Sequence, residues 1–192
     1  MPTITTLLIA VNAGVFLLQQ GAPVLVPAFA LWPLGAGFEP WQLLTYAFLH
    51  GSLVHIAFNM FALYMFGAPV ERVFGPRRYL IYYLVCVLSA AIVQMLTSSL
   101  TGAVYPTVGA SGGVFGLLLA YAIYFPNNRV MLIFPPIPMP ARVFVFVYAA
   151  LELFLGVTGT QEGVAHFAHL GGLVGGFILL RFWRSSPARW RS

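Results

Sequence analysis

Residues 108–125 read VGASGGVFGLLLAYAIYF, and they place one small hydroxyl, Ser111, among four glycines at the head of a long apolar run. Such an apolar run is typical of a membrane-spanning helix. Gly109, Ser111 and Gly113 satisfy the G-x-S-x-G pattern of soluble hydrolases, but that motif also requires a preceding strand, which the sequence does not predict. Glycines at this spacing commonly form packing surfaces between membrane helices. By itself, the stretch therefore favours helix packing over catalysis.

The composition of the whole chain is that of a membrane protein. Of its 192 residues, 60% are hydrophobic and 7% are charged, far from the roughly half-apolar, quarter-charged composition of a soluble domain. The net charge of +5 does not indicate nucleic-acid binding, because the basic residues stand at the ends of apolar runs. A single cysteine, Cys86, excludes a disulfide framework and a CxxC metal site. We expect one membrane domain over residues 1–192, with no soluble domain and no nucleic-acid partner.

Apolar runs and helix-breaking residues predict an all-α bundle of six membrane spans. The spans are expected near residues 4–20, 49–67, 77–98, 111–125, 141–157 and 166–183. A Gly-Pro pair at residues 75–76 suits the end of a helix, and the proline-rich residues 134–140 separate the fourth span from the fifth. Residues 21–40 are expected to form an interfacial loop, which Trp32 and Trp41 hold at headgroup depth.

All nine basic residues are arginines, and six spans place them on one side of the membrane. They are Arg72, Arg77, Arg78, Arg129, Arg142, Arg181, Arg184, Arg189 and Arg191. The positive-inside rule makes that side cytoplasmic, so both termini are expected inside, with Glu39 and Glu162 outside. We expect a multi-pass protein of the lipid bilayer, in a bacterial cytoplasmic membrane, with its site open to the outer side.

Polar side chains within the spans are functional candidates, because they are costly in hydrocarbon. His55 and Asn59 are four residues apart and share one face of the second span, whereas His50 is expected to be rotated away from that face in a supporting role. The second, fourth and sixth spans all descend from the outer side. Their first turns therefore place His55, Ser111 and a histidine of the sixth span about one to two helical turns below the surface.

A serine nucleophile needs a base within hydrogen-bond reach, and the sixth span offers His166 and His169. Ser111 begins its helix, where free backbone N–H groups can stabilise an oxyanion, and His55 and Asn59 supply further donors. The chain contains no aspartate. The sequence therefore predicts a Ser-His dyad rather than a Ser-His-Asp triad.

Glycine packing is expected to hold this dyad in place. Residues 171–176 contain two overlapping GxxxG patterns, and Gly172 and Gly176 of the sixth span can approach Gly112 and Gly116 of the fourth.

The sequence also predicts roles for three features near this dyad. Phe115, one turn after Ser111, is expected to lie against the histidine ring. Glu152 in the fifth span is expected to be structural, with cavity lining or tuning of the site as alternatives. The glycine-containing residues 156–163 are expected to form a mobile cap.

Three ordered motifs resemble those of the rhomboid intramembrane serine proteases. They are H-x4-H-x3-N at residues 50–59, GASG at residues 109–112, and A-H-x2-G-x3-G at residues 168–176. Members of that family often carry Trp-Arg before the second span, where this chain has Trp41 and Gln42, a departure that concerns the anchoring of the loop.

The resemblance implies a six-span rhomboid-like bundle with Ser111 as nucleophile and His169, rather than His166, as base. It implies oxyanion or supporting roles for His55, Asn59, Gly109 and His50. The implied activity is that of a serine endopeptidase, without cofactor or metal, that cleaves transmembrane protein substrates near the outer membrane face through an acyl-enzyme.

Two alternatives stay open. One is a metal or solute transporter lined by His50, His55, His166 and His169. The other is a rhomboid-like pseudoprotease that binds membrane clients without cleaving them.

Overall fold

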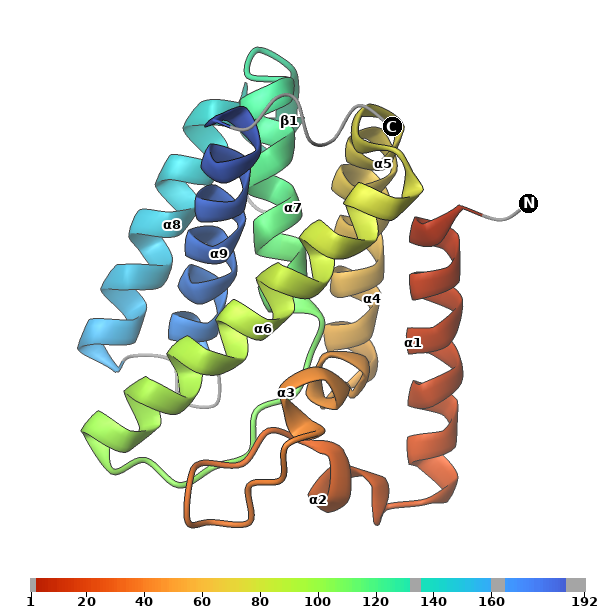
Figure 1. The fold of residues 1–192 in the computed structure, drawn as a ribbon, viewed down its shortest axis with the longest axis vertical. Coiled ribbons are helices and arrows are strands. Elements are labelled where there is room, and N and C mark those ends of the chain that lie inside the picture. Colours follow the sequence, from red (N-terminus) through yellow and green to blue (C-terminus); the bar gives the residue numbers. More distant parts are fainter. Residues whose placement is uncertain (1–2, 132–135, 160–164, 186–192) are drawn as a thin grey trace.

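A computed structural model of the chain describes residues 3–131, 136–159 and 165–185. In these ranges the protein is a bundle of helices with one small sheet (Figure 1). The helices are α1 (Ile4–Gly21), α2 (Leu25–Phe29), α3 (Gln42–Thr45), the 3-10 turn η1 (Tyr46–Phe48), α4 (Leu53–Ala62), the π-helical turn η2 (Leu63–Gly67), α5 (Ala68–Phe74), α6 (Pro76–Thr101), α7 (Ser111–Tyr124), α8 (Ala141–Thr158) and α9 (His166–Ser185). An antiparallel pair, β1 (Arg129–Met131) with β2 (Pro138–Pro140), forms the sheet, which the all-helical prediction did not include.

In the part of the chain that the structure describes, four helical segments are long and apolar enough to cross a membrane. They are Ile4–Gly21, Leu53–Phe74, Pro76–Thr101 and Ala141–Thr158. α7 is apolar but has only 14 residues, or about 21 Å of helix, which is shorter than the roughly 30 Å hydrocarbon core. α9 has 20 residues but is not among the four. The protein is therefore an integral membrane protein, and the count of six spans stays a prediction.

The second predicted span begins later than expected. α4 starts at Leu53 because the Ser52 hydroxyl accepts a hydrogen bond of 3.1 Å from the His55 backbone N–H and caps the helix. His50 lies before this cap, and its backbone N–H and C=O are both bonded to the Gln19 side chain of α1. The prediction that helical rotation turns His50 away from His55 was wrong, since the two rings meet edge to face with centroids 5.1 Å apart.

Gln42 anchors the loop between α1 and α4. It follows Trp41, at the position where members of the family that the sequence resembles often have arginine. Its buried side chain accepts a hydrogen bond from the Trp32 backbone N–H (3.2 Å) and donates to the carbonyls of Ala28 and Gly37. The Trp41 indole N–H also donates to Ala28 (3.1 Å). An amide at this position can therefore tie the loop together without a positive charge.

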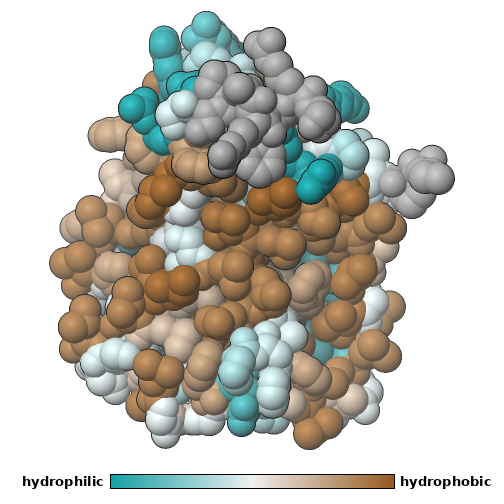
Figure 2. All heavy atoms as spheres, viewed as in Figure 1, coloured by the Kyte–Doolittle hydropathy of each residue, from teal (hydrophilic) through white to brown (hydrophobic). Residues whose placement is uncertain are grey.

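The surface is divided into an apolar belt and a polar end. Figure 2 shows hydrophobic residues across the middle of one face and hydrophilic residues gathered at the top, where Figure 1 places the ends of α5 and α9. The described arginines lie on α5, β1 and α9 and at the starts of α6 and α8. Arg189, Arg191 and Glu162 lie outside the described residues. The cytoplasmic assignment of this end stays a prediction.

Close backbone contacts hold α9 against α7. A Cβ atom added at Gly172 would overlap the carbonyl group of Gly112. One added at Gly116 would overlap the side chain of Cys86 on α6 and lie 3.2 Å from the Gly172 carbonyl oxygen. The three helices therefore meet at positions that only glycine can occupy without displacing a neighbour.

Of the four glycines in the two overlapping patterns of α9, three face α6 and one faces α7. A Cβ atom at Gly171 would lie 2.9 Å from the Ala90 backbone, and one at Gly175 would collide with Ser89, so this pattern faces α6. In the other pattern only Gly172 meets α7, because Gly176 faces Tyr82 of α6.

Replacing Gly172 with alanine is expected to destabilise the bundle by about 1–3 kcal/mol, the usual cost of overpacking a close contact. The measurement is thermal unfolding of the purified protein in detergent. Gly14→Ala on α1 is the matched control, since a Cβ atom there would have no neighbour within 4 Å. Equal melting temperatures for the two variants would contradict the proposed role of the α7–α9 contact.

Candidate active site

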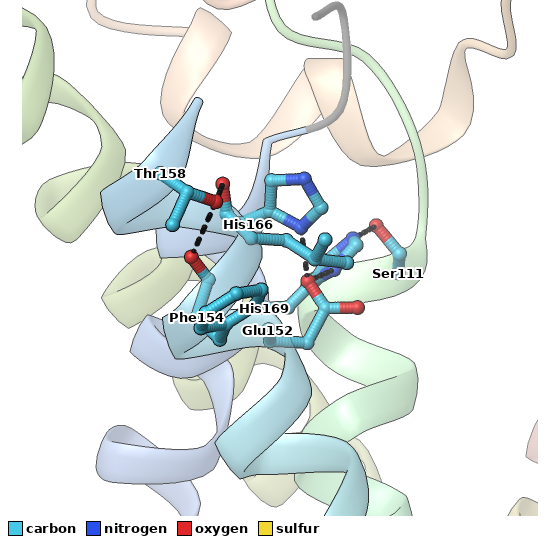
Figure 3. Close-up of polar contacts among 7 residues, drawn as sticks. Ser111, Glu152, Phe154, Thr158, His166 and His169 are labelled. Carbon is cyan, nitrogen blue, oxygen red and sulfur yellow. Dashed lines mark hydrogen bonds and ion pairs between the residues drawn. The ribbon is translucent and has the colours of Figure 1, made fainter. Parts of the chain in front are cut away.

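The first turns of α7 and α9 bring Ser111 and His169 together. Ser111 is the first residue of α7, and its Oγ lies 2.8 Å from Nε2 of His169 (Figure 3). Both residues are partly buried. This distance and pairing match what a nucleophilic serine and its base require.

Glu152 of α8 adds a carboxylate to this pair. Its Oε2 lies 2.9 Å from Nδ1 of His169 and 2.6 Å from Nδ1 of His166, between the two imidazoles (Figure 3). The side chain of Glu152 exposes only 6% of its surface, and that of His169 12%. The structure therefore has a Ser-His-Glu arrangement, where the sequence predicted a Ser-His dyad and favoured a structural role for Glu152 over lining the cavity or tuning the site.

Aromatic rings hold His169 from another side. The Phe115 ring stacks on the His169 imidazole with centroids 4.4 Å apart and an angle of 6° between the planes. Tyr148 of α8 stacks on Phe115 in turn, at 5.2 Å. Phe115 thus makes the contact that its position one turn after Ser111 predicts.

His55 and Asn59 of α4 border the same site. The Gly51 backbone N–H donates to Nδ1 of His55 (3.4 Å), so the neutral ring carries its proton on Nε2. That nitrogen faces the loop before α7, because a Cβ atom at Gly109 would lie 2.8 Å from it. Asn59 donates one amide hydrogen to the His55 carbonyl (3.1 Å) and retains a second. Both side chains therefore have a donor to offer.

A cavity of about 1100 Å³ opens onto these groups. His55, Asn59, Ser111 and His169 line it, together with the polar residues Thr107 and Arg129. Most of the other lining side chains are apolar, and they come from α4, η2, α7, α8, the β1–β2 hairpin and the loop before α7. It is large enough for several residues of an extended peptide beside Ser111.

The predicted cap is only partly described. Gly156, Val157 and Thr158 belong to α8 rather than to a loop, and residues 160–163 lie outside the described residues. A Cβ atom at Gly156 would lie 3.1 Å from His166 and 3.0 Å from the Phe167 ring. Gly156 is therefore a packing residue between α8 and α9 and not part of a loop.

The carboxylate and the two histidines around it also have the composition of a metal site. The ligand atoms of Glu152, His166 and His169 lie within 4.8 Å of one another. Tetrahedral zinc with bonds of about 2.0–2.1 Å holds its ligand atoms about 3.3 Å apart. The contacts of 2.6 and 2.9 Å are shorter and have hydrogen-bond lengths. His50 and His55, the other ligands of the transporter alternative, are not part of this cluster.

Together, these features describe a helical membrane protein in which a histidine lies within hydrogen-bond distance of both a serine and a glutamate beside a cavity. The sequence pattern of the Rhomboid domain matches residues 37–185. The chain belongs to the rhomboid family.

Curated relatives include proteins named as proteases. The chain is 33% identical over 140 residues to the rhomboid protease GluP of Bacillus subtilis (strain 168), covering 73% of this chain and 25% of GluP. It is 36% identical over 153 residues to RHOMBOID-like protein 4 of Arabidopsis thaliana, covering 74% and 34%. It is 33% identical over 148 residues to the mitochondrial RHOMBOID-like protein 6 of the same plant, covering 74% and 43%. The chain spans less than half the length of each of these relatives.

Replacing Gly109 with alanine is expected to displace the His55 ring. Gly109 has φ +126°, which favours glycine, and the new Cβ would lie 2.8 Å from the ring. Gly35→Ala is the control, since Gly35 also has positive φ (+80°) but open space around it. We expect both variants to melt at a lower temperature than the parent. Gly109→Ala should lose about 1–2 kcal/mol more of its free energy of unfolding than Gly35→Ala. An equal or smaller fall for Gly109→Ala would contradict the close contact with His55.

Proposed function

We propose that the chain is an intramembrane serine endopeptidase. The observation that carries this proposal is the 2.8 Å contact between Ser111 Oγ and His169 Nε2, made at a helix start that borders a cavity of about 1100 Å³. Family membership supports it, since relatives of this family are named proteases.

In the proposed reaction, Ser111 Oγ attacks the carbonyl carbon of a peptide bond while its proton passes to Nε2 of His169. The developing oxyanion is stabilised by backbone N–H groups at the start of α7, together with the side-chain donors of His55 and Asn59. His169 then returns the proton to the leaving amine, which departs and leaves an acyl-enzyme on Ser111. The same imidazole then takes a proton from a water molecule, which attacks the carbonyl carbon of the ester. The acid product leaves, and the imidazole returns the proton to Ser111 Oγ, so that both side chains are restored.

Transmembrane segments of other membrane proteins are the proposed substrates. The cavity is lined mainly by apolar side chains, including Phe58, Met65 and Val147, which suits a segment drawn from the bilayer. A helical segment must unwind before attack, because its carbonyl groups are bonded within the helix. We place cleavage near the outer face of a bacterial cytoplasmic membrane, in a six-span protein whose arginine-rich end faces the cytoplasm.

Removing either reacting side chain is expected to abolish proteolysis. Ser111→Ala and His169→Ala should each reduce cleavage of a single-span model substrate in detergent by about 1000-fold or more. Ser111 should also be the residue labelled by a fluorophosphonate, as mass spectrometry of the labelled peptide would show. Ser99→Ala is the matched control, because Ser99 is exposed and bonds only to the Met95 carbonyl of its own helix. Cleavage that persists in Ser111→Ala would refute the proposal.

The two alternatives make different predictions in the same assay. A metal or solute transporter lined by His50, His55, His166 and His169 predicts stoichiometric zinc in the purified protein and no labelling of Ser111. The proposed protease predicts activity that withstands EDTA. A pseudoprotease predicts binding of the substrate with neither cleavage nor labelling.

A further inference from the structure

Glu152 lies where a carboxylate can control the state of the base. One oxygen, Oε2, is within hydrogen-bond distance of Nδ1 of both His169 and His166, and all three side chains are largely buried. An ionised carboxylate only accepts hydrogen bonds, so each Nδ1 must carry the hydrogen that it shares with Oε2. In neutral His169 the Nε2 atom is then without a proton and faces Ser111.

We propose that Glu152 is a positioning residue for His169, so that the site works as a Ser111–His169–Glu152 triad rather than as a dyad. The inference rests on the proposed function, because it assigns a task within that reaction. The carboxylate holds the tautomer whose Nε2 can accept the serine proton. It also stabilises the imidazolium that forms when that proton arrives, and it takes up no proton itself.

His166 gives the carboxylate a second fixed contact. His166 lies one helical turn before His169 on α9, and its Nδ1 donates to the same Oε2 at 2.6 Å. Gly156, one turn after Glu152 on α8, lets the two helices approach at this level, since a Cβ atom there would crowd His166 and Phe167. Glu152 is therefore held by α9 at two points, which limits how far its carboxylate can turn away from His169.

The decisive variant is Glu152→Gln, which keeps the shape of the side chain and removes its charge. A glutamine amide can donate to Nδ1 and thereby place the proton on Nε2, the wrong nitrogen for a base. We expect kcat for the model substrate to fall by about 100-fold or more, with KM changed by less than about threefold. Glu152→Asp restores the charge and should recover at least about tenfold of the lost kcat.

Glu71→Gln is the matched control. Glu71 is a second buried carboxylate, but it binds the N–H groups of Ile4 and Thr5 at the start of α1, away from the site. This variant should lower the melting temperature and leave kcat of the folded protein within about threefold of the parent. A Glu152→Gln enzyme with kcat within about threefold of the parent would overturn the inference. So would equal losses of kcat in Glu152→Gln and Glu152→Asp accompanied by a raised KM.

A measurement on the unmodified protein covers the case in which Glu152→Gln does not fold. Nitrogen-15 NMR of histidine-labelled protein, with His169 assigned by its absence from His169→Ala, reports which ring nitrogen carries the hydrogen. We expect a protonated Nδ1 and an unprotonated Nε2, and the opposite tautomer would overturn the inference. If the parent protein does not cleave the model substrate or is not labelled by the fluorophosphonate, the proposed function is overturned instead. The tautomer of His169 would still test its contact with Glu152.

Discussion

The approach of α9 to α7 at Gly172 and Gly112 sets the geometry of the site. Gly112 follows Ser111 directly, and Gly172 is one helical turn after His169. A Cβ atom at Gly172 would overlap the Gly112 carbonyl, so the separation of the two helix backbones here is fixed by the absence of side chains. That separation allows the short serine side chain to reach Nε2 at 2.8 Å. A larger residue at Gly172 would move the reacting atoms apart together with the helices, whereas one at Gly112 would collide with Ala90 of α6.

The serine and the histidine could be inferred from the sequence because both lie in local motifs. Glycine spacing predicted which helices approach, and the first turns of alternate spans predicted a common depth. Family resemblance then distinguished His169 from His166. Five of the six predicted ranges coincide with helices to within three residues, since apolar runs and prolines mark helix ends locally, whereas the second helical segment runs on to Phe74 and not to residue 67.

Glu152 could not be predicted in the same way. Its contact with His169 depends on the rotation and depth of α8 relative to α9, and the residues that join these helices carry no pattern that fixes either. The missing aspartate also suggested that no carboxylate supports the base. His50 illustrates a different cause of error. A serine two residues after it is a helix-capping signal, and starting the helix there would have removed the argument that His50 is rotated away from His55.

The position of α8 links access to the cavity with the state of the base. The buried residues of α8 are Ala141 and Phe144 near one end and Glu152 near the other, so the second half of the helix is held to α9 at Glu152 and Gly156. Leu151, next to Glu152, and Tyr148, one turn before it, both line the cavity. Displacing this half of α8 would therefore widen the cavity and at the same time withdraw the carboxylate from His169.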